Sequence, residues 1–264
     1  MKLTGIVLAG GKSSRFGFNK IKVKLGKIPL FIDQIFKLSF FCNEILISSS
    51  IENYKTMAGG LKNIENYYNY CCFSEDMHIP PVKIVLDDIK LDNRNNSNLS
   101  KIGPIAGIYT GLTNAKNPFC LVLAFDMPFI SYNLLELLVE KNKNNSKDAV
   151  VIKTKKGFEA LCGLYSKKCI KIMKGNIGKG IYKISDIYPC LNTEMILEAD
   201  LKQYNIDMLN FFNINTLADN NDFKKIWRSG IAENDANYFS SKVGKKWGNF
   251  FYRGAGKEIK VKGL

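Results

Sequence analysis

A glycine-rich loop near the start of the chain carries residues that could bind a polyphosphate. An apolar run, Ile6–Ala9, ends at Gly10 and Gly11, and Arg15 and Lys20 follow shortly after. Such a run is typical of a buried strand in a parallel sheet. Glycines let the backbone approach a ligand closely, and backbone N–H groups with Arg and Lys bind anions. The stretch therefore predicts a site for a polyanion such as a triphosphate; the alternative is a tight strand-to-helix turn with two solvated charges.

Two common phosphate-binding motifs do not fit this loop. Lys12 follows Gly11 without the earlier glycine that GxxxxGK[ST] requires, and no GxGxxG is present. A dinucleotide-binding fold of the GxGxxG kind is therefore disfavoured.

A second candidate site follows a strongly apolar run at 119–124. Asp126 is the single carboxylate at its C-terminal end. Ligands of open parallel sheets bind at the carboxyl ends of the strands, and Mg²⁺ often takes only one or two protein carboxylates while it bridges phosphates. Asp126 is thus a candidate Mg²⁺ ligand. The alternative is that Asp126 caps the next helix, although Ser131 is closer to the expected start of that helix.

Apolar runs alternate with helical patterns along the chain, which predicts an α/β fold. We expect a single three-layer domain, with a mostly parallel, doubly wound sheet and helices on both faces. Residues 51–81 indicate an irregular surface excursion with some helix. The other expected elements are strands at 44–50, 82–88 and 148–152 and helices at 29–41 and 134–143.

The composition fits one large folded domain, or one domain and a short extension. The chain has 264 residues, 46% of them hydrophobic and 12% aromatic, which suffices for a sizeable core. It shows no leader pattern and no apolar run near the roughly 20 residues of a membrane span. Seven cysteines without a CxxC pair indicate reduced thiols in a cytoplasmic protein rather than a disulfide frame or a zinc site.

The formal net charge of +14 raises the question of nucleic-acid binding. Lysines are spread along the whole chain rather than gathered in one motif, and a polyanionic substrate would also benefit from a positive field. We therefore do not expect nucleic acid as the main partner. Aromatic residues alternate with basic ones in 220–264; this pattern can bind single strands, but packing on the body or on a partner is the simpler expectation.

Residues 8–20 resemble the signature loop of the nucleotidyltransferases related to molybdenum cofactor guanylyltransferase. That loop usually reads LAGGxSxRMGxDK, and here Phe16 and Asn19 replace the common Met and Asp. The resemblance implies a nucleotidyltransferase domain over residues 1–219 and a C-terminal extension over 220–264. Further stretches similar to family motifs are 103–112 (GPLAGIxxGL), 123–130 (LACDMPFL), 157–165 (Gxx(E/H)PLxxLY, on the acceptor side) and 212–216 (FxNxNTPxD).

The resemblance implies a nucleotidyltransferase-like Rossmann variant that transfers GMP from GTP to molybdenum-bound molybdopterin. The products would be the guanine dinucleotide form of the molybdenum cofactor and pyrophosphate. The implied cofactor is Mg²⁺, the ligands are GTP and molybdopterin or molybdenum-molybdopterin, and the partners include other cofactor-biosynthesis proteins or molybdoenzymes. Cytidylyl transfer, another nucleotidyl transfer of the same fold, and an inactive nucleotide-binding partner protein are the alternatives.

The family's functional positions carry over residue by residue. Arg15 and Lys20 would hold the triphosphate as catalytic residues, and Asp126 would hold Mg²⁺. Asp87, or its neighbour Asp88, would contact the guanine base. The other nucleotide- or pterin-binding positions are Leu8, Ala9, Gly10, Gly11, Ser50 (often Asn in relatives), Gly103, Asn213 and Asn215. The two asparagines at 213 and 215 could instead close a turn by bonding their own backbone.

Overall fold

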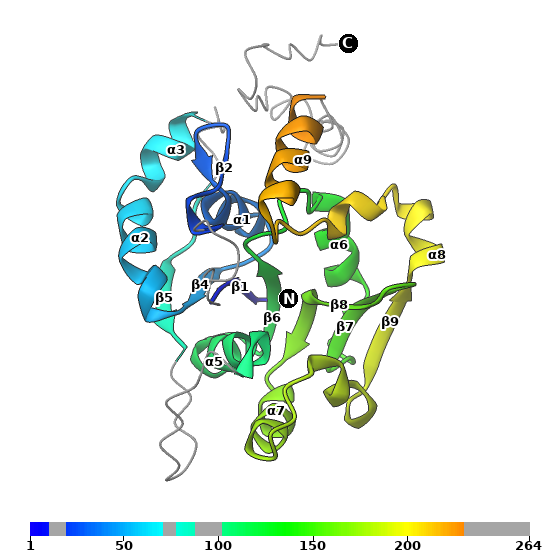
Figure 1. Ribbon diagram of the computed structural model, residues 1–264. Coiled ribbons are helices and arrows are strands. Elements are labelled where there is room, and N and C mark those ends of the chain that lie inside the picture. The colour runs from blue at the N-terminus through cyan, green and yellow to red at the C-terminus, as the bar shows by residue number, and fades with distance from the viewer. Residues whose placement is uncertain (11–19, 71–77, 88–101, 230–264) are drawn as a thin grey trace.

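A twisted seven-stranded sheet forms the centre of the protein (Figure 1). The computed structural model describes residues 1–10, 20–70, 78–87 and 102–229. The strand order is β5-β4-β1-β6-β8-β7-β9, and only β8 runs antiparallel to its neighbours. The strands are β1 (Leu3–Ala9), β4 (Glu44–Ser49), β5 (Val82–Leu86), β6 (Phe119–Ala124), β7 (Ala149–Thr154), β8 (Gly157–Ser166) and β9 (Thr193–Leu197).

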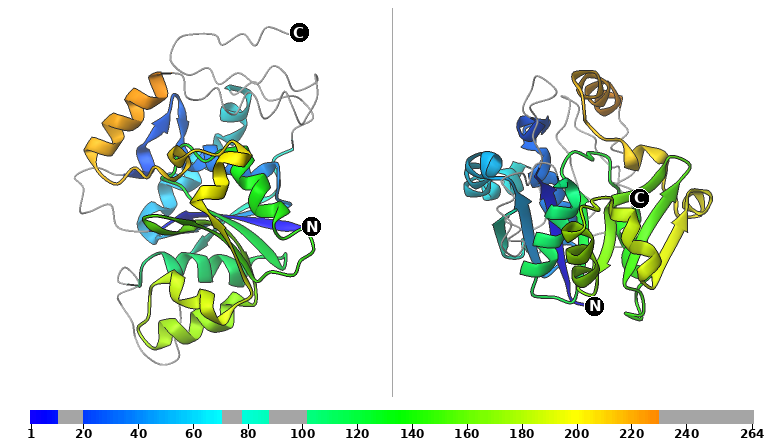
Figure 2. Two further views of the ribbon diagram at one scale, coloured as in Figure 1. Left: turned by 90° about the vertical axis from the view of Figure 1, so that its right-hand side faces the viewer. Right: turned by 60° about the horizontal axis from the view of Figure 1, so that its bottom comes forward.

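Helices cover both faces of this sheet (Figure 2). One apolar core lies between the sheet and α1 (Leu30–Ser39) and α6 (Tyr132–Glu140), and the other between the sheet and α5 (Pro104–Asn114) and α7 (Cys169–Gly178). The three-layer α/β class expected from the sequence is confirmed. The remaining elements are the short strands β2 (Lys24–Leu25) and β3 (Ile28–Pro29), the α-helices α2 (Ile51–Lys62), α3 (Ile64–Tyr70), α8 (Glu198–Leu201) and α9 (Leu217–Arg228), and the 3-10 helices η2 (Lys20–Lys22), η3 (Ile184–Cys190), η4 (Lys202–Tyr204) and η5 (Met208–Phe211).

Residues 51–70 are more regular than their sequence indicates. They form α2 and α3 despite the pair Gly59-Gly60, which lowers helix propensity. Met57 is buried, and Gly60 lies directly against the ring of Phe31 on α1. The missing side chain at 60 therefore allows close helix packing, which offsets the low propensity.

Helix α5 lies unusually close to the sheet because of its glycines. A Cβ built at Gly111 would lie 2.6 Å from Ile6 Cδ1 of β1. Gly107 faces Leu8 and Ser48 in the same way, with a built Cβ 3.1 Å from each side chain. Gly107 and Gly111 thus allow the helix to lie against β1 and β4, next to the strand ends that carry the candidate site.

Helix α9 crosses the boundary that the sequence analysis placed after residue 219. Thr216 and Asp219 form a capping box at its start, and Phe223 is buried against Phe129 with 5.6 Å between ring centroids. Because α9 is docked in this way, we propose that the domain continues through α9 and that the extension begins after residue 229.

Two further findings bear on the sequence expectations. Within the described ranges, no helix is long and apolar enough to cross a membrane. The cysteines described by the structure are free thiols: Cys42, Cys120, Cys162 and Cys169 are buried, and Cys190 is exposed.

Candidate active site

The candidate residues gather at the carboxyl ends of β1 and β6. These strands are parallel neighbours, and Leu8 pairs with Ala124. The backbone N–H of Phe125 donates to the Leu8 carbonyl over 3.1 Å. Gly10, after β1, and Asp126, after β6, therefore follow two aligned strands at one edge of the sheet.

Lys20 joins three distant segments at this edge. Its Nζ lies 3.3 Å from Asp126 Oδ2 and donates over 2.7 Å to Asn215 Oδ1. Asn215 is itself held by the first turn of α9, since the Asp219 carboxylate accepts from the N–H groups of Asn215 and Thr216, each over 2.8 Å. The structure thus brings the predicted site residues Lys20, Asp126 and Asn215 together.

Asp126 occupies a largely buried position, with 17% of its side chain exposed. Burial raises the pKa of its carboxyl group, while the charge and hydrogen bond of Lys20 act to lower it. The side chain does not cap α6, because Ser131 holds the cap position and its Oγ accepts from the Leu134 N–H over 3.3 Å. The capping alternative for Asp126 is therefore wrong.

Asp87 forms a second polar group beside Gly10, directly after β5. It accepts a hydrogen bond from the hydroxyl of Ser48 on β4, and its carboxylate lies directly against Gly10. Burial raises the pKa of Asp87, and the Ser48 hydrogen bond acts to lower it. A side chain at Gly10 would collide with the Asp87 carboxylate in this position, so the glycine lets that carboxylate reach across the end of β4 to the end of β1.

The end of β4 carries another candidate, Ser50. It is the N-cap residue of α2, and its buried hydroxyl has no hydrogen-bond partner among the described residues. One turn into α2, the Asn53 side chain donates to the Ala9 carbonyl over 3.0 Å. Asn53 was not among the predicted site residues, and its only signal in the sequence is an amide side chain in the first turn after a strand.

The remaining candidates have different outcomes. Gly103 is the N-cap residue of α5 and has a φ of +76°, in the region that favours glycine. The Asn213 side chain donates to the Phe211 carbonyl over 3.1 Å. It therefore closes a turn, which was the alternative to nucleotide or pterin binding. Gly11, Arg15 and Asp88 lie outside the described residues.

The acceptor side predicted for 157–165 begins with β8. Glu159 lies near its start, where its Oε1 accepts from the Thr154 hydroxyl over 3.3 Å. Burial raises the pKa of Glu159, and the Thr154 hydrogen bond and the Lys156 charge act to lower it. The last pair between the antiparallel strands β6 and β8 is Leu123–Cys162. Asp126 lies three residues after Leu123, and Glu159 lies three residues before Cys162. Both carboxylates therefore belong to the same edge of the sheet.

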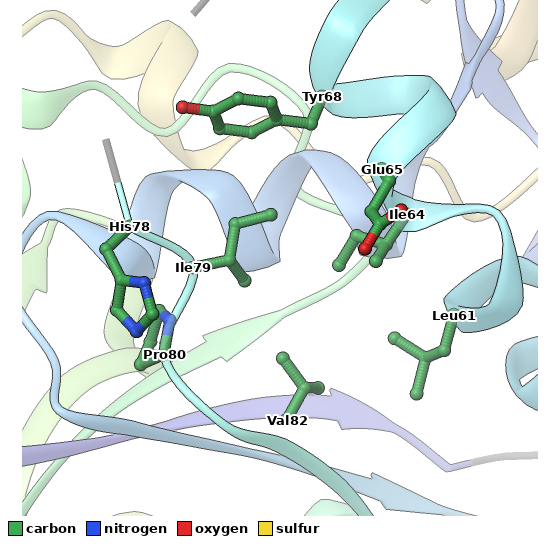
Figure 3. A pocket seen from close by; sticks show the side chains of 8 residues that line it. All are labelled: Leu61, Ile64, Glu65, Tyr68, His78, Ile79, Pro80 and Val82. Carbon is green, nitrogen blue, oxygen red and sulfur yellow. The ribbon is translucent and has the colours of Figure 1, made fainter. Parts of the chain in front are cut away.

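A hollow of about 460 Å³ lies elsewhere on the molecule (Figure 3). Its lining is mostly apolar, and none of the candidate residues takes part. Val82 of the lining begins β5 and pairs with Ile45, so the hollow lies toward the amino ends of the strands. His78, the single histidine of the chain, also lines it. The lining residues are Leu61, Ile64, Glu65, Tyr68, His78, Ile79, Pro80 and Val82.

The model of the MobA-like NTP transferase domain matches residues 5–188. This chain belongs to that family. The match spans β1, the end of β6 and β8, and it confirms both the resemblance found in the sequence and the assignment as a nucleotidyltransferase. The end of β6 within this match carries Asp126, which lies 3.3 Å from Lys20 Nζ.

Similar proteins agree with this assignment. Relatives from Thermococcus sibiricus and Clostridium perfringens are both named "Probable molybdenum cofactor guanylyltransferase". The first is 30% identical over 224 residues, which cover 82% of this chain and 95% of the relative. The second is 29% identical over 231 residues, which cover 85% and 98%. The crystal structure of molybdopterin-guanine dinucleotide biosynthesis protein A from Archaeoglobus fulgidus has the same fold, with a TM-score of 0.61 at 24% identity, over 84% of this chain and 97% of that one.

Proposed function

We propose that this nucleotidyltransferase transfers GMP from GTP to the terminal phosphate of molybdenum-bound molybdopterin and releases pyrophosphate. The observation that carries the proposal is the position of Lys20, whose ammonium lies between Asp126 and Asn215 at the carboxyl edge of the sheet. A fixed cation beside a glycine-rich strand end supports triphosphate binding. The names of the relatives support GTP and molybdopterin as the substrates.

Asp126 and Asn215 have the right chemistry for a magnesium ion. Each directs an oxygen at the same cation, the Lys20 ammonium, which stands in for a metal at this point. Mg²⁺ prefers oxygen ligands and usually takes few from the protein. Three or more His, Cys, Asp or Glu side chains do not gather anywhere in the described ranges, so this pair is the best-supported ligand set. When bound, Mg²⁺ would neutralise charge on the phosphates.

Asp87 is the residue we assign to base recognition. Its carboxylate can accept from the N1–H and the 2-amino group of guanine, a paired donor edge that cytosine lacks. Ser48 orients this carboxylate, and Gly10 allows it to lie against the end of β1. Charge-assisted hydrogen bonds of this kind contribute about 1.5–3 kcal/mol, which would favour GTP over CTP by about tenfold or more.

The reaction needs little acid–base chemistry from the protein. The acceptor phosphate is already an anionic nucleophile, so its oxygen can form the new bond to the α-phosphorus without a strong general base. The bond from that phosphorus to the bridging oxygen breaks, and pyrophosphate leaves with the charge. Lys20 would hold the triphosphate. Arg15 would do the same, and this second assignment is based on the sequence motif alone. Catalysis is then positioning and charge neutralisation.

The experiment that tests the function is incubation with each of the four NTPs, Mg²⁺ and molybdenum-molybdopterin, with pyrophosphate as the readout. We expect release with GTP that depends on the acceptor. Lys20→Met should lower the rate by about 100-fold or more, the range for a lost charge-stabilising donor. Lys22→Met is the matched control, because Lys22 is exposed in the same 3-10 helix and its loss should leave the rate unchanged.

Other outcomes separate the alternatives. Equal release with CTP would favour a cytidylyltransferase. Nucleotide binding without release for any NTP would favour an inactive partner protein. A Lys22→Met variant that lost as much activity as Lys20→Met would show that general charge, rather than the position of Lys20, matters.

A further inference from the structure

Helix α1 carries a buried ion pair that the proposed chemistry does not use. Asp33 is 0% and Lys37 3% exposed, and Lys37 Nζ lies 2.9 Å from Asp33 Oδ2 one helical turn away. The free energy lost in desolvating such a pair often exceeds the attraction between its two charges. Proteins with apolar residues in place of the pair are often as stable. Stability is therefore a weak explanation for a charged pair at this position.

The polar side chains of α1 reach the loop that carries Asp126. Lys37 Nζ donates to the Pro128 carbonyl and Gln34 Nε2 donates to the Met127 carbonyl, each over 3.0 Å. Gln34 is also fully buried. Met127 and Pro128 directly follow Asp126, so α1 holds the carbonyls of the two residues after it. Helix α1 itself packs against the central strand β1 and offers a rigid support.

The other side of the same loop is held by the segment 210–214. The Ile214 N–H donates to the Asp126 carbonyl over 3.0 Å. The Ser131 hydroxyl donates to Asn210 Oδ1 over 2.8 Å. The loop is thus fixed from two sides, and the Ile214 N–H provides a direct report of where the backbone of Asp126 lies.

We propose that Gln34 and Lys37 are positioning residues that fix the Asp126 loop, with Asp33 compensating the charge of Lys37. The metal-binding consequence rests on the function proposed above. Residues that hold metal ligands in place typically change metal affinity or activity by about 10- to 100-fold when they are lost. The contacts of Gln34 and Lys37 hold backbone carbonyls directly after the proposed metal ligand Asp126. Loss of these contacts should therefore loosen the Asp126 loop more than the rest of the fold.

Two α1 variants and one matched control test this role. Gln34→Leu removes the donor to Met127 without a charge change. Asp33→Leu combined with Lys37→Met removes the donor to Pro128 and leaves no buried charge from the pair. Thr4→Val is the control, because it removes polar contacts at the opposite edge of the sheet. Thr4 Oγ1 donates to Glu44 Oε2 over 3.0 Å and accepts from Asn117 Nδ2 over 3.1 Å at the amino end of β1.

The first readout is amide hydrogen exchange in the ligand-free protein. Both α1 variants should speed exchange at Ile214 by at least several-fold relative to the core amides of β6, and Thr4→Val should not. The second readout is the apparent Kd for Mg²⁺ in the presence of GTP, which should rise about 10- to 100-fold in the α1 variants only.

The proposal is overturned if exchange at Ile214 and the Kd for Mg²⁺ change no more in the α1 variants than in Thr4→Val. If the double variant does not fold, Gln34→Leu decides alone. If the parent protein binds no GTP, the proposed function fails, while exchange at Ile214 still decides whether α1 positions the loop.

Discussion

Replacing Lys37 by Met should destabilise the protein strongly at neutral pH and only weakly near pH 4. At 2.9 Å and an effective dielectric constant of about 20, the attraction between Lys37 and Asp33 is roughly 6 kcal/mol before desolvation is subtracted. Removal of one partner from a buried pair typically costs about 3–5 kcal/mol, because the other charge stays buried. We expect a loss in that range at pH 7.

The pH dependence follows from the pKa of Asp33. Burial raises this pKa above its ordinary value of 3.8, and the charge and hydrogen bond of Lys37 act to lower it. Without Lys37 the pKa of Asp33 in the folded state rises further. Below 3.8 the carboxyl is neutral in the folded and unfolded states, so no buried carboxylate remains. As the pH rises toward the raised pKa, the unfolded chain releases the proton first, so the stability of the variant falls relative to the parent.

Urea unfolding followed by circular dichroism between pH 4 and 7 measures this difference, provided that the m-value stays constant. Asp33→Leu combined with Lys37→Met is the matched comparison. It leaves the Pro128 carbonyl without its donor, at about 1–3 kcal/mol, so it should be more stable than Lys37→Met at pH 7. Because it has no carboxyl group at position 33, it should not show the fall in stability with pH that Asp33 causes in Lys37→Met. A pH-independent loss in Lys37→Met, or a double variant no more stable than the single one, would refute the reasoning.

Three further expectations concern the site and its packing. Asp126→Asn removes the proposed metal-binding carboxylate and should slow Mg²⁺-dependent pyrophosphate release about a thousandfold, equivalent to several kcal/mol of transition-state stabilisation; near-parent turnover in a folded variant would remove Asp126 from the mechanism. Asp87→Ala should abolish the preference for GTP over CTP, a change of about tenfold or more in the ratio of their kcat/KM values, and an unchanged ratio would contradict the assignment. Gly111→Ala places a Cβ 2.6 Å from Ile6 Cδ1 and should cost about 1–3 kcal/mol through overpacking. Gly59→Ala, which meets no atom within 4 Å, is the control and should stabilise α2 by about 0.4–1 kcal/mol; a Gly111→Ala variant that unfolds thermally at or above the parent's temperature would show that the close approach of α5 has no energetic weight.

The amino-acid sequence by itself determined the sheet and the edge that carries the candidate site. The apolar runs at Ile6–Ala9 and 119–124 predict strands buried on both faces, and β1 and β6 are such strands. Parallel strands of one sheet carry their carboxyl ends at the same edge, so Gly10 and Asp126 were expected at one edge, and the structure adds that β1 and β6 are neighbours. The motif around Lys20 adds a cation, and the structure places its Nζ 3.3 Å from Asp126 Oδ2. These inferences succeed because they depend on local periodicity and on the direction of the chain.

Only the tertiary structure decided which polar side chains support that edge. Gln34 and Lys37 stand between apolar residues of a helix, a pattern typical of a solvent-facing stripe, yet both are buried. Their acceptors lie 93 and 91 positions away in the sequence. Asn213 and Asn215 are equivalent in the motif, but one closes a turn and the other meets Lys20. A backbone carbonyl carries no sequence signal, so contacts made to it by distant side chains exist only once the layers have packed.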